Sequence, residues 1–210
     1  MSDTTHDMTI QGGTPDFLYV PHLDVHTHNP CPEGPAIVHV EAVPGLTALP
    51  DAPRADVLYS LGVHPWNAGR SDVAEALESQ RRLAESAPTQ LAAIGECGLD
   101  RLRGPGLDVQ KDVFMTQARL AARLGLPLIV HCVRAWGELL AARRRLLAET
   151  GTAGTAEEPV WIVHGFRGKP ALARQLLDAG MHLSFGPRHN PASLAITPPN
   201  RCHRESDEDF

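Results

Sequence analysis

Histidines and acidic residues recur in this sequence at one kind of position, where a short apolar segment ends. The first such segment runs into His26 and His28, and Glu96 directly follows another. His131 and His164 each close a further apolar segment. Imidazole nitrogens combined with carboxylate oxygens suit zinc, manganese or iron, and also magnesium where carboxylates dominate. These five residues therefore indicate a site for divalent metal ions.

Short apolar segments, typical of buried strands, alternate with longer helical patterns along the chain. The candidate strands are Leu23–His26, Ala36–Val43, Val57–Val63, Leu91–Gly95, Leu126–His131, Val160–His164 and His182–Phe185. Such alternation predicts a parallel sheet with crossover helices. In a parallel β/α barrel all strand carboxyl ends open onto one face, which carries the active site. The sequence thus predicts a TIM-barrel-like (β/α) fold in which the five candidate ligands share one pocket.

The segments between the strands support this interpretation. In Leu107–Gly125, Val109, Val113, Leu120 and Leu124 recur at helical spacing and predict one buried face. Pro170–Ala179 is expected to be a helix, and Thr150–Glu158 a loop. Residues 1–15 are polar and are expected to be a flexible tail. Residues 16–210 are expected to form a single domain.

Composition limits the kinds of partner. The formal net charge is −6 over 210 residues, which argues against a broad basic surface for a nucleic-acid backbone. A phosphate substrate must then be met locally. The sequence shows no signal peptide or membrane span, and its 4 cysteines form no CxxC pair, so we expect a soluble, cytoplasmic protein. No feature indicates an oligomeric state.

Six sequence blocks, taken in order, resemble the signatures of a known family. They are Asp24-Val25-His26-Thr27-His28, Gly62-Val63-His64-Pro65-Trp66, Gly95-Glu96-Cys97-Gly98-Leu99-Asp100, Ile129-Val130-His131-Cys132, Val163-His164-Gly165-Phe166 and Leu183-Ser184-Phe185-Gly186. The set resembles the TatD family of metal-dependent hydrolases and deoxyribonucleases, in its compact branch, from about His22 to Asp207. The resemblance implies two or three divalent metals and cleavage of phosphodiester bonds, often at the 3′ ends of DNA.

The resemblance also implies roles for individual residues around two divalent metals (Zn, Mn or Mg). His26 and His28 would hold one metal, and Glu96 would bridge to the second. His131 and His164 would complete the second site. Asp207, in the block Glu205-Ser206-Asp207, corresponds to the family's final metal acid.

The implied chemistry is hydrolysis of DNA or a small phosphodiester by a water that two metals activate. Asp207, or failing it Glu96, would orient that water and accept its proton. His64 would contact the substrate phosphate. Arg134, Arg167 and Arg188 follow strands and are further candidates for phosphate binding.

The C-terminal segment departs from the family pattern. Relatives have an apolar last strand followed by a closing helix, whereas this chain reads Arg201-Cys202-His203-Arg204 and ends at Phe210. A buried strand does not normally carry two arginines. We therefore expect 201–207 to be a poorly packed edge rather than a buried eighth strand. Asp207 would then reach the metals only once a substrate or partner ordered the segment.

Two other functions stay open. The first is an amidohydrolase acting on an amide or lactone, because that superfamily also begins with His-x-His. Many such enzymes bridge their metals with a carbamylated lysine, and this chain has only Lys111 and Lys169, each in a helical segment. The second is a catalytically degenerate metal-binding protein, for which the altered C-terminal segment is the argument.

Overall fold

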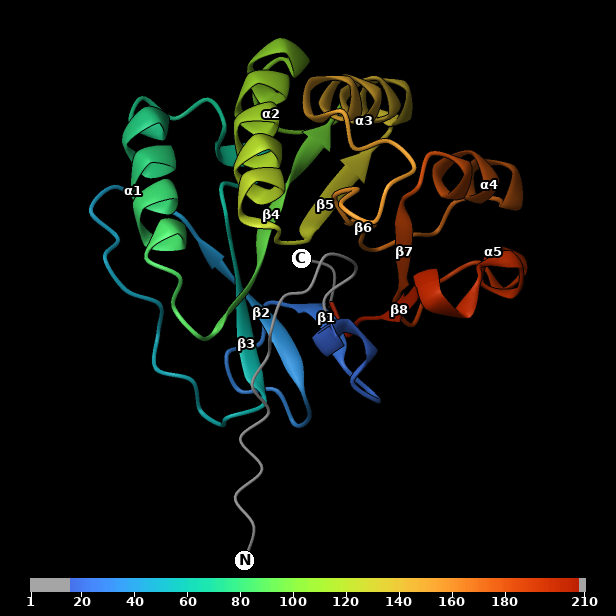
Figure 1. Ribbon diagram of the computed structural model, residues 1–210, viewed down its shortest axis with the longest axis horizontal. Coiled ribbons are helices and arrows are strands. Elements are labelled where there is room, and N and C mark those ends of the chain that lie inside the picture. The colour runs from blue at the N-terminus through green and yellow to red at the C-terminus, as the bar shows by residue number, and fades with distance from the viewer. Residues whose placement is uncertain (1–15, 208–210) are drawn as a thin grey trace, which may run out of the picture.

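Eight parallel strands close into a barrel in strictly sequential order, β1 to β8 (Figure 1). The computed structural model describes residues 16–207, so the expected tail at 1–15 lies outside the described residues. The strands are β1 Asp24–Thr27, β2 Ala36–Glu41, β3 Val57–Gly62, β4 Leu91–Asp100, β5 Leu128–Val133, β6 Trp161–Val163, β7 His182–Phe185 and β8 Cys202–Arg204. The expected TIM-barrel-like fold is confirmed.

Helices cover the barrel from β3 onward. They are α1 Val73–Glu85, α2 Leu107–Leu124, α3 Trp136–Thr150, α4 Pro170–Asp178 and α5 Pro191–Ile196, with short 3₁₀ turns η1 Asp16–Tyr19, η2 Pro65–Asn67 and η3 Pro199–Arg201. Figure 1 shows α1, α2 and α3 side by side along the part of the barrel that contains β4 and β5. Irregular loops, rather than helices, connect β1 to β2 and β2 to β3.

The main hydrophobic core lies between the helices and the strands. Phe114 of α2 packs edge-to-face on Trp161 of β6, with ring centroids 5.2 Å apart, and Leu139 and Leu146 of α3 are fully buried in the same cluster. Burying a large apolar side chain of this kind contributes about 1.5–3 kcal/mol. Because strands such as β5 are covered on both faces, they read as continuous apolar runs in the sequence.

Helix α2 begins and ends where the sequence indicates, but one residue of its expected buried face, Val109, is exposed. Gly125 ends it in the left-handed conformation, with φ 67°, which glycine adopts without the strain a Cβ would add. Val113 is buried, but Val109 is 45 % exposed, so the expected face is wrong at that position. Gln110 takes its place at 1 % exposure. A polar side chain occupies the core because hydrogen bonds satisfy it there.

The expectation of a loose edge at 201–207 is wrong, because β8 closes the barrel. Its three residues pair with β7, and Arg204 pairs with Asp24 of β1. The anticipated cost of burying arginine does not arise. Arg204 is exposed, and the Arg201 guanidinium donates to the Leu177 carbonyl at 2.8 Å. Of the three β8 residues only His203 is buried, at 6 % exposure, and it is hydrogen-bonded to His182.

Candidate metal-binding active site

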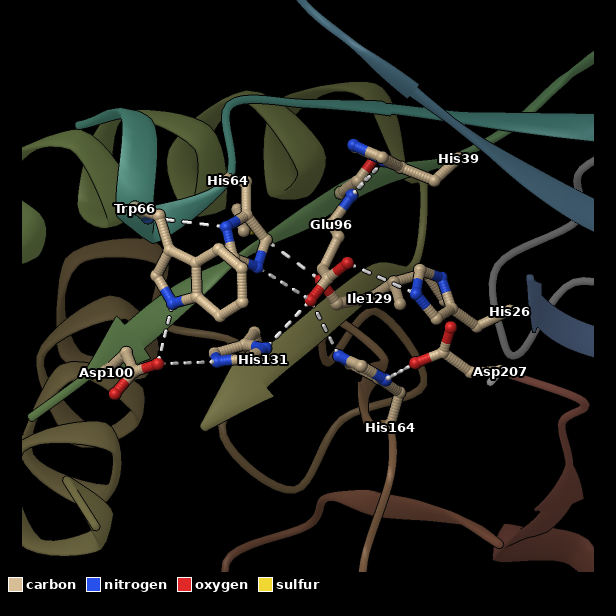
Figure 2. A network of polar contacts seen from close by, with 12 residues as sticks. His26, His39, His64, Trp66, Glu96, Asp100, Ile129, His131, His164 and Asp207 are labelled. Carbon is tan, nitrogen blue, oxygen red and sulfur yellow. Dashed lines mark hydrogen bonds and ion pairs between the residues drawn. The ribbon is translucent and has the colours of Figure 1, made fainter. Parts of the chain in front are cut away.

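A buried carboxylate, Glu96, is the centre of a ring of histidines (Figure 2). The Glu96 side chain is 3 % exposed. Five imidazoles approach its two oxygens. The distances are 3.2 Å to His26 Nε2, 3.2 Å to His28 Nε2, 3.1 Å to His64 Nε2, 2.8 Å to His131 Nδ1 and 2.9 Å to His164 Nε2. The five predicted ligands therefore lie together.

The barrel explains this convergence. His26 and His28 stand in and just after β1, His131 is in β5, and His164 directly follows β6. Glu96 was expected near a strand end, but β4 continues past it to Asp100, so its carboxylate is held inside the barrel mouth. A cavity of about 1020 Å³ opens above these residues.

The donor set fits divalent metal ions. His26, His28 and Glu96 offer ligand atoms within 4.8 Å of one another, and so do His26, His164 and Asp207. His26 is fully buried. Its Nε2 lies 3.2 Å from Glu96 Oε2 without hydrogen-bond geometry, and its Nδ1 has no hydrogen-bond partner among residues 16–207. An unsatisfied buried polar atom is costly, and a cation between His26 and Glu96 would remove that cost at Nε2. The mixture of imidazole and carboxylate suits zinc or manganese.

Burial and charge compete in setting the protonation of this site. Burial raises the pKa of Glu96, but the opposing charges of His164 and His26 and several hydrogen bonds hold it well below its ordinary value. Burial lowers the pKa of His164, and the charge of Glu96 outweighs this and raises it to about 9. His26, where burial and the charge of His164 dominate, has a pKa of about 3. Glu96 thus carries the negative charge that attracts cations.

His64 presents a proton to the cavity. It caps the 3₁₀ turn η2, where its Nδ1 accepts the backbone N–H of Trp66 at 3.3 Å. A neutral imidazole whose Nδ1 accepts carries its proton on Nε2. Burial lowers the pKa of His64, which favours the neutral ring. Its Nε2–H points at Glu96 Oε1 and is therefore suited to donate to an anion.

His39 and Glu41 belong to the site, although no sequence motif singled them out. His39 Nδ1 accepts the backbone N–H of Glu96 at 2.8 Å and fixes the main chain that carries the central carboxylate. Its Nε2 faces Glu41, which in turn accepts the backbone N–H of His64 at 3.1 Å. The available signal was their alternation along β2, which resembles the spacing of His26 and His28 at the end of β1.

Two buried glutamines of α2 hold the strand ends beneath the cavity. Gln117 accepts the Val63 N–H at 2.8 Å and donates to the Val63 carbonyl at 3.0 Å, directly before His64. Gln110 makes the equivalent pair with Asp100, at 2.7 and 2.9 Å. These amides replace strand pairing where the main chain leaves the sheet. Helical spacing could have placed both glutamines on the buried face of α2, but apolar periodicity gives no signal for polar side chains.

Asp207 lies at the cluster without any ordering by substrate, contrary to expectation. Its Oδ2 is 3.8 Å from His164 Nδ1. Three hydrogen bonds anchor the segment that carries it. Asp24 of β1 accepts from the backbone N–H and the hydroxyl of Ser206, and buried Glu205 accepts the Gly165 N–H at 2.6 Å.

The three predicted phosphate-binding arginines divide into two groups. Arg167 and Arg188 line the cavity, as does Arg103, which was not predicted. Arg134 is exposed and lies outside the set of cavity-lining residues. The cavity thus has cationic side chains at its rim and a negative centre at its floor.

A closed parallel β/α barrel with histidines and acids at its carboxyl-terminal mouth is an architecture of metal-dependent hydrolases. The family model described as TatD related DNase matches residues 38–208. The chain therefore belongs to the TatD family. The resemblance of its sequence blocks is confirmed.

Individual relatives agree with the family assignment. The chain is 35% identical over 126 residues to the 3′-5′ ssDNA/RNA exonuclease TatD of Cronobacter turicensis, covering 59% of this chain and 43% of the relative. It is 35% identical over 141 residues to human Deoxyribonuclease TATDN3, covering 62% and 48%. The chain thus spans less than half the length of these relatives.

A solved structure shows the same fold. The crystal structure of YJJV, a TatD homolog from Escherichia coli, superposes with a TM-score of 0.65 at 23% identity, covering 86% of this chain and 76% of that one. Within residues 16–207, none of the helices combines the length and the apolar character that crossing a bilayer requires.

Proposed function

We propose that this protein is a divalent-metal-dependent phosphodiesterase that hydrolyses DNA or a small phosphodiester with two bound metals. The observation that carries the proposal is the convergence of five histidines on the buried carboxylate of Glu96. His26 and His28 would hold one metal, His131 and His164 would hold the second, and Glu96 would contribute a ligand to both. Bound zinc, manganese or magnesium would supply Lewis acidity and a water of lowered pKa.

The remaining side chains bind the substrate and handle the proton. Asp207, beside His164 and His26, orients the attacking water and accepts its proton. His64 donates its Nε2–H to a phosphate oxygen. Arg167 and Arg188 at the rim meet the flanking phosphates. The protein is acidic overall, so this local group of donors must provide the attraction for a polyanion.

Two features favour nucleic acid as the substrate. The cavity, at about 1020 Å³, is at the upper end of the range for small-molecule sites, which favours a substrate larger than a simple phosphodiester. Two relatives bear names that state exonuclease and deoxyribonuclease activity. Single-stranded DNA is therefore the substrate we would test first.

The amidohydrolase alternative receives less support from the lysines. Lys111 lies in α2 and pairs with Asp108 at 2.6 Å, and Lys169 caps α4. Neither lies on β4, where Glu96 occupies the bridging position. The degenerate, non-catalytic alternative predicts damaged ligands, whereas all six predicted ligands gather at the cavity floor.

The test is hydrolysis by metal-stripped protein before and after addition of manganese, magnesium or zinc. Substrates are bis-p-nitrophenyl phosphate, a labelled single-stranded oligonucleotide, and a panel of lactones and amides. We expect metal-dependent cleavage of both phosphodiesters. Hydrolysis of lactones or amides alone would favour the amidohydrolase alternative, and a metal-loaded but inert protein would favour the non-catalytic one.

A further inference from the structure

Asp100, the last residue of β4, joins the rim of the cavity to a proposed metal ligand. Its side chain is 2 % exposed. Oδ2 accepts the Trp66 indole Nε1–H at 2.7 Å and lies 3.3 Å from His131 Nε2. Oδ1 accepts the backbone N–H groups of Leu102 and Arg103 at 2.7 and 3.1 Å. Figure 2 shows Asp100 bridging the Trp66 and His131 rings.

The position of this carboxylate is fixed independently of His131. Gln110 of α2 accepts the Asp100 backbone N–H and donates to the Asp100 carbonyl. Each side-chain oxygen is then held by groups that can only donate, an indole N–H on one and two backbone N–H groups on the other. The Asp100 carboxylate therefore has a fixed orientation and acts only as an acceptor, so the protonation of the neighbouring His131 ring must match it.

This constraint determines which nitrogen of His131 carries the proton. Because Asp100 Oδ2 only accepts, its contact with His131 Nε2 requires an N–H at Nε2. In a neutral imidazole the lone pair is then on Nδ1. Nδ1 is the nitrogen that faces the cluster, 2.8 Å from Glu96 Oε1. In the metal-free protein the same rule places a proton between Nδ1 and Glu96, and a bound cation would replace that proton, while Nε2–H stays on Asp100.

We propose that Asp100 is a positioning residue that holds His131 in the Nε2–H tautomer and ring orientation, so that Nδ1 is the metal-binding atom. The inference rests on the proposed metal site and adds to it the ligand atom and the residue that selects it. Carboxylates that accept the second N–H of a metal-bound histidine raise the basicity of the ligand and set its direction.

The variant Asp100→Asn tests the proposal by metal affinity. The amide oxygen can still accept from Leu102 and Arg103, but its NH₂ then faces the N–H groups of Trp66 and His131. His131 is driven to the other tautomer, which places a proton on Nδ1. We expect zinc affinity, measured by chelator competition without substrate, to fall about 10–100-fold. Trp66→Phe removes the other donor to Oδ2 and is the matched control, with zinc affinity close to that of the wild type.

A second measurement needs no variant. Long-range ¹H–¹⁵N correlation spectra of the zinc-loaded wild type should show His131 metal-bound through Nδ1 and protonated at Nε2. Zinc on Nε2, or unchanged zinc affinity in a folded Asp100→Asn, would overturn the proposal. Failure of the proposed function is distinguishable, because zinc binding with this signature can persist in a protein that cleaves no phosphodiester.

Discussion

Two buried histidine sites in the same barrel, His164 at the mouth and the pair His182 and His203 between β7 and β8, titrate in opposite directions. At the mouth, His164 is buried beside Glu96, and its pKa is raised to about 9. Between β7 and β8, His182 and His203 stack with ring planes 10° apart and share a hydrogen bond of 2.9 Å. Burial lowers their pKa values, to about 3 for His182 and about 4 for His203.

The difference comes from the charges that face each group. Burial alone favours the neutral imidazole in both places. At the mouth the carboxylates of Glu96, Glu205 and Asp207 act on His164 and reverse that preference. His182 is instead close to the cationic side chains of Arg201 and Arg143, which add to the effect of burial. A buried histidine is thus a candidate metal ligand where it contacts a carboxylate. It is a structural residue where its only buried polar contact is another histidine.

The largest loss of stability is expected from removing the C-terminal segment, because it contributes His203 to one histidine site and Asp207 to the other. Truncation after Pro199 deletes β8, His203 and Asp207 together and leaves β1 and β7 without their shared partner. We expect this chain to lose its cooperative thermal transition, followed by circular dichroism. A chain ending at Asp207 keeps every described element and is the control. A truncated protein that still unfolds cooperatively would show that 201–207 is a loosely packed edge and not an integral strand.

The second prediction separates the regions by function. Glu96→Gln keeps the side-chain shape but removes the charge that the histidines surround, so we expect phosphodiester turnover to fall about 100-fold or more. The melting temperature of the metal-free protein should change little. His203→Leu, in the other histidine group, is the comparison and should retain turnover. Wild-type turnover in Glu96→Gln would show that the central carboxylate is not required.

The third and smallest effect concerns acid sensitivity. As the pH falls from about 6.5 to 5, unfolded chains protonate both His182 and His203, while the native pair stays neutral. The unfolded state then binds more protons, so the free energy of unfolding decreases as the pH is lowered, by up to about 1.4 kcal/mol per pH unit for each proton. His203→Leu removes one such proton. Urea unfolding with chelator present should show a shallower loss of stability between pH 6 and 5, and curves parallel to the wild type would contradict the assignment.

Motif spacing predicted the candidate metal ligands better than it predicted the residues that surround and support them. His26, His28, Glu96, His131 and His164 stand at apolar segment ends, and in a parallel barrel that position alone places them on one face. His39 was missed because a single histidine within a strand is ordinary until its neighbours are known. Its importance comes from the backbone of Glu96, a partner 57 residues away.

The sequence by itself determined the fold class and the family and indicated the candidate metal ligands, because these follow from local periodicity and from short motifs whose order is specific. Only the tertiary structure decided that β8 closes the barrel, that Gln110 and Gln117 occupy the buried face of α2, and that Asp207 reaches His164. The physical reason is that each of these outcomes depends on a hydrogen bond or charge contributed by a distant segment. Local sequence reports the cost of burying a polar group, whereas the fold supplies the partner that offsets it.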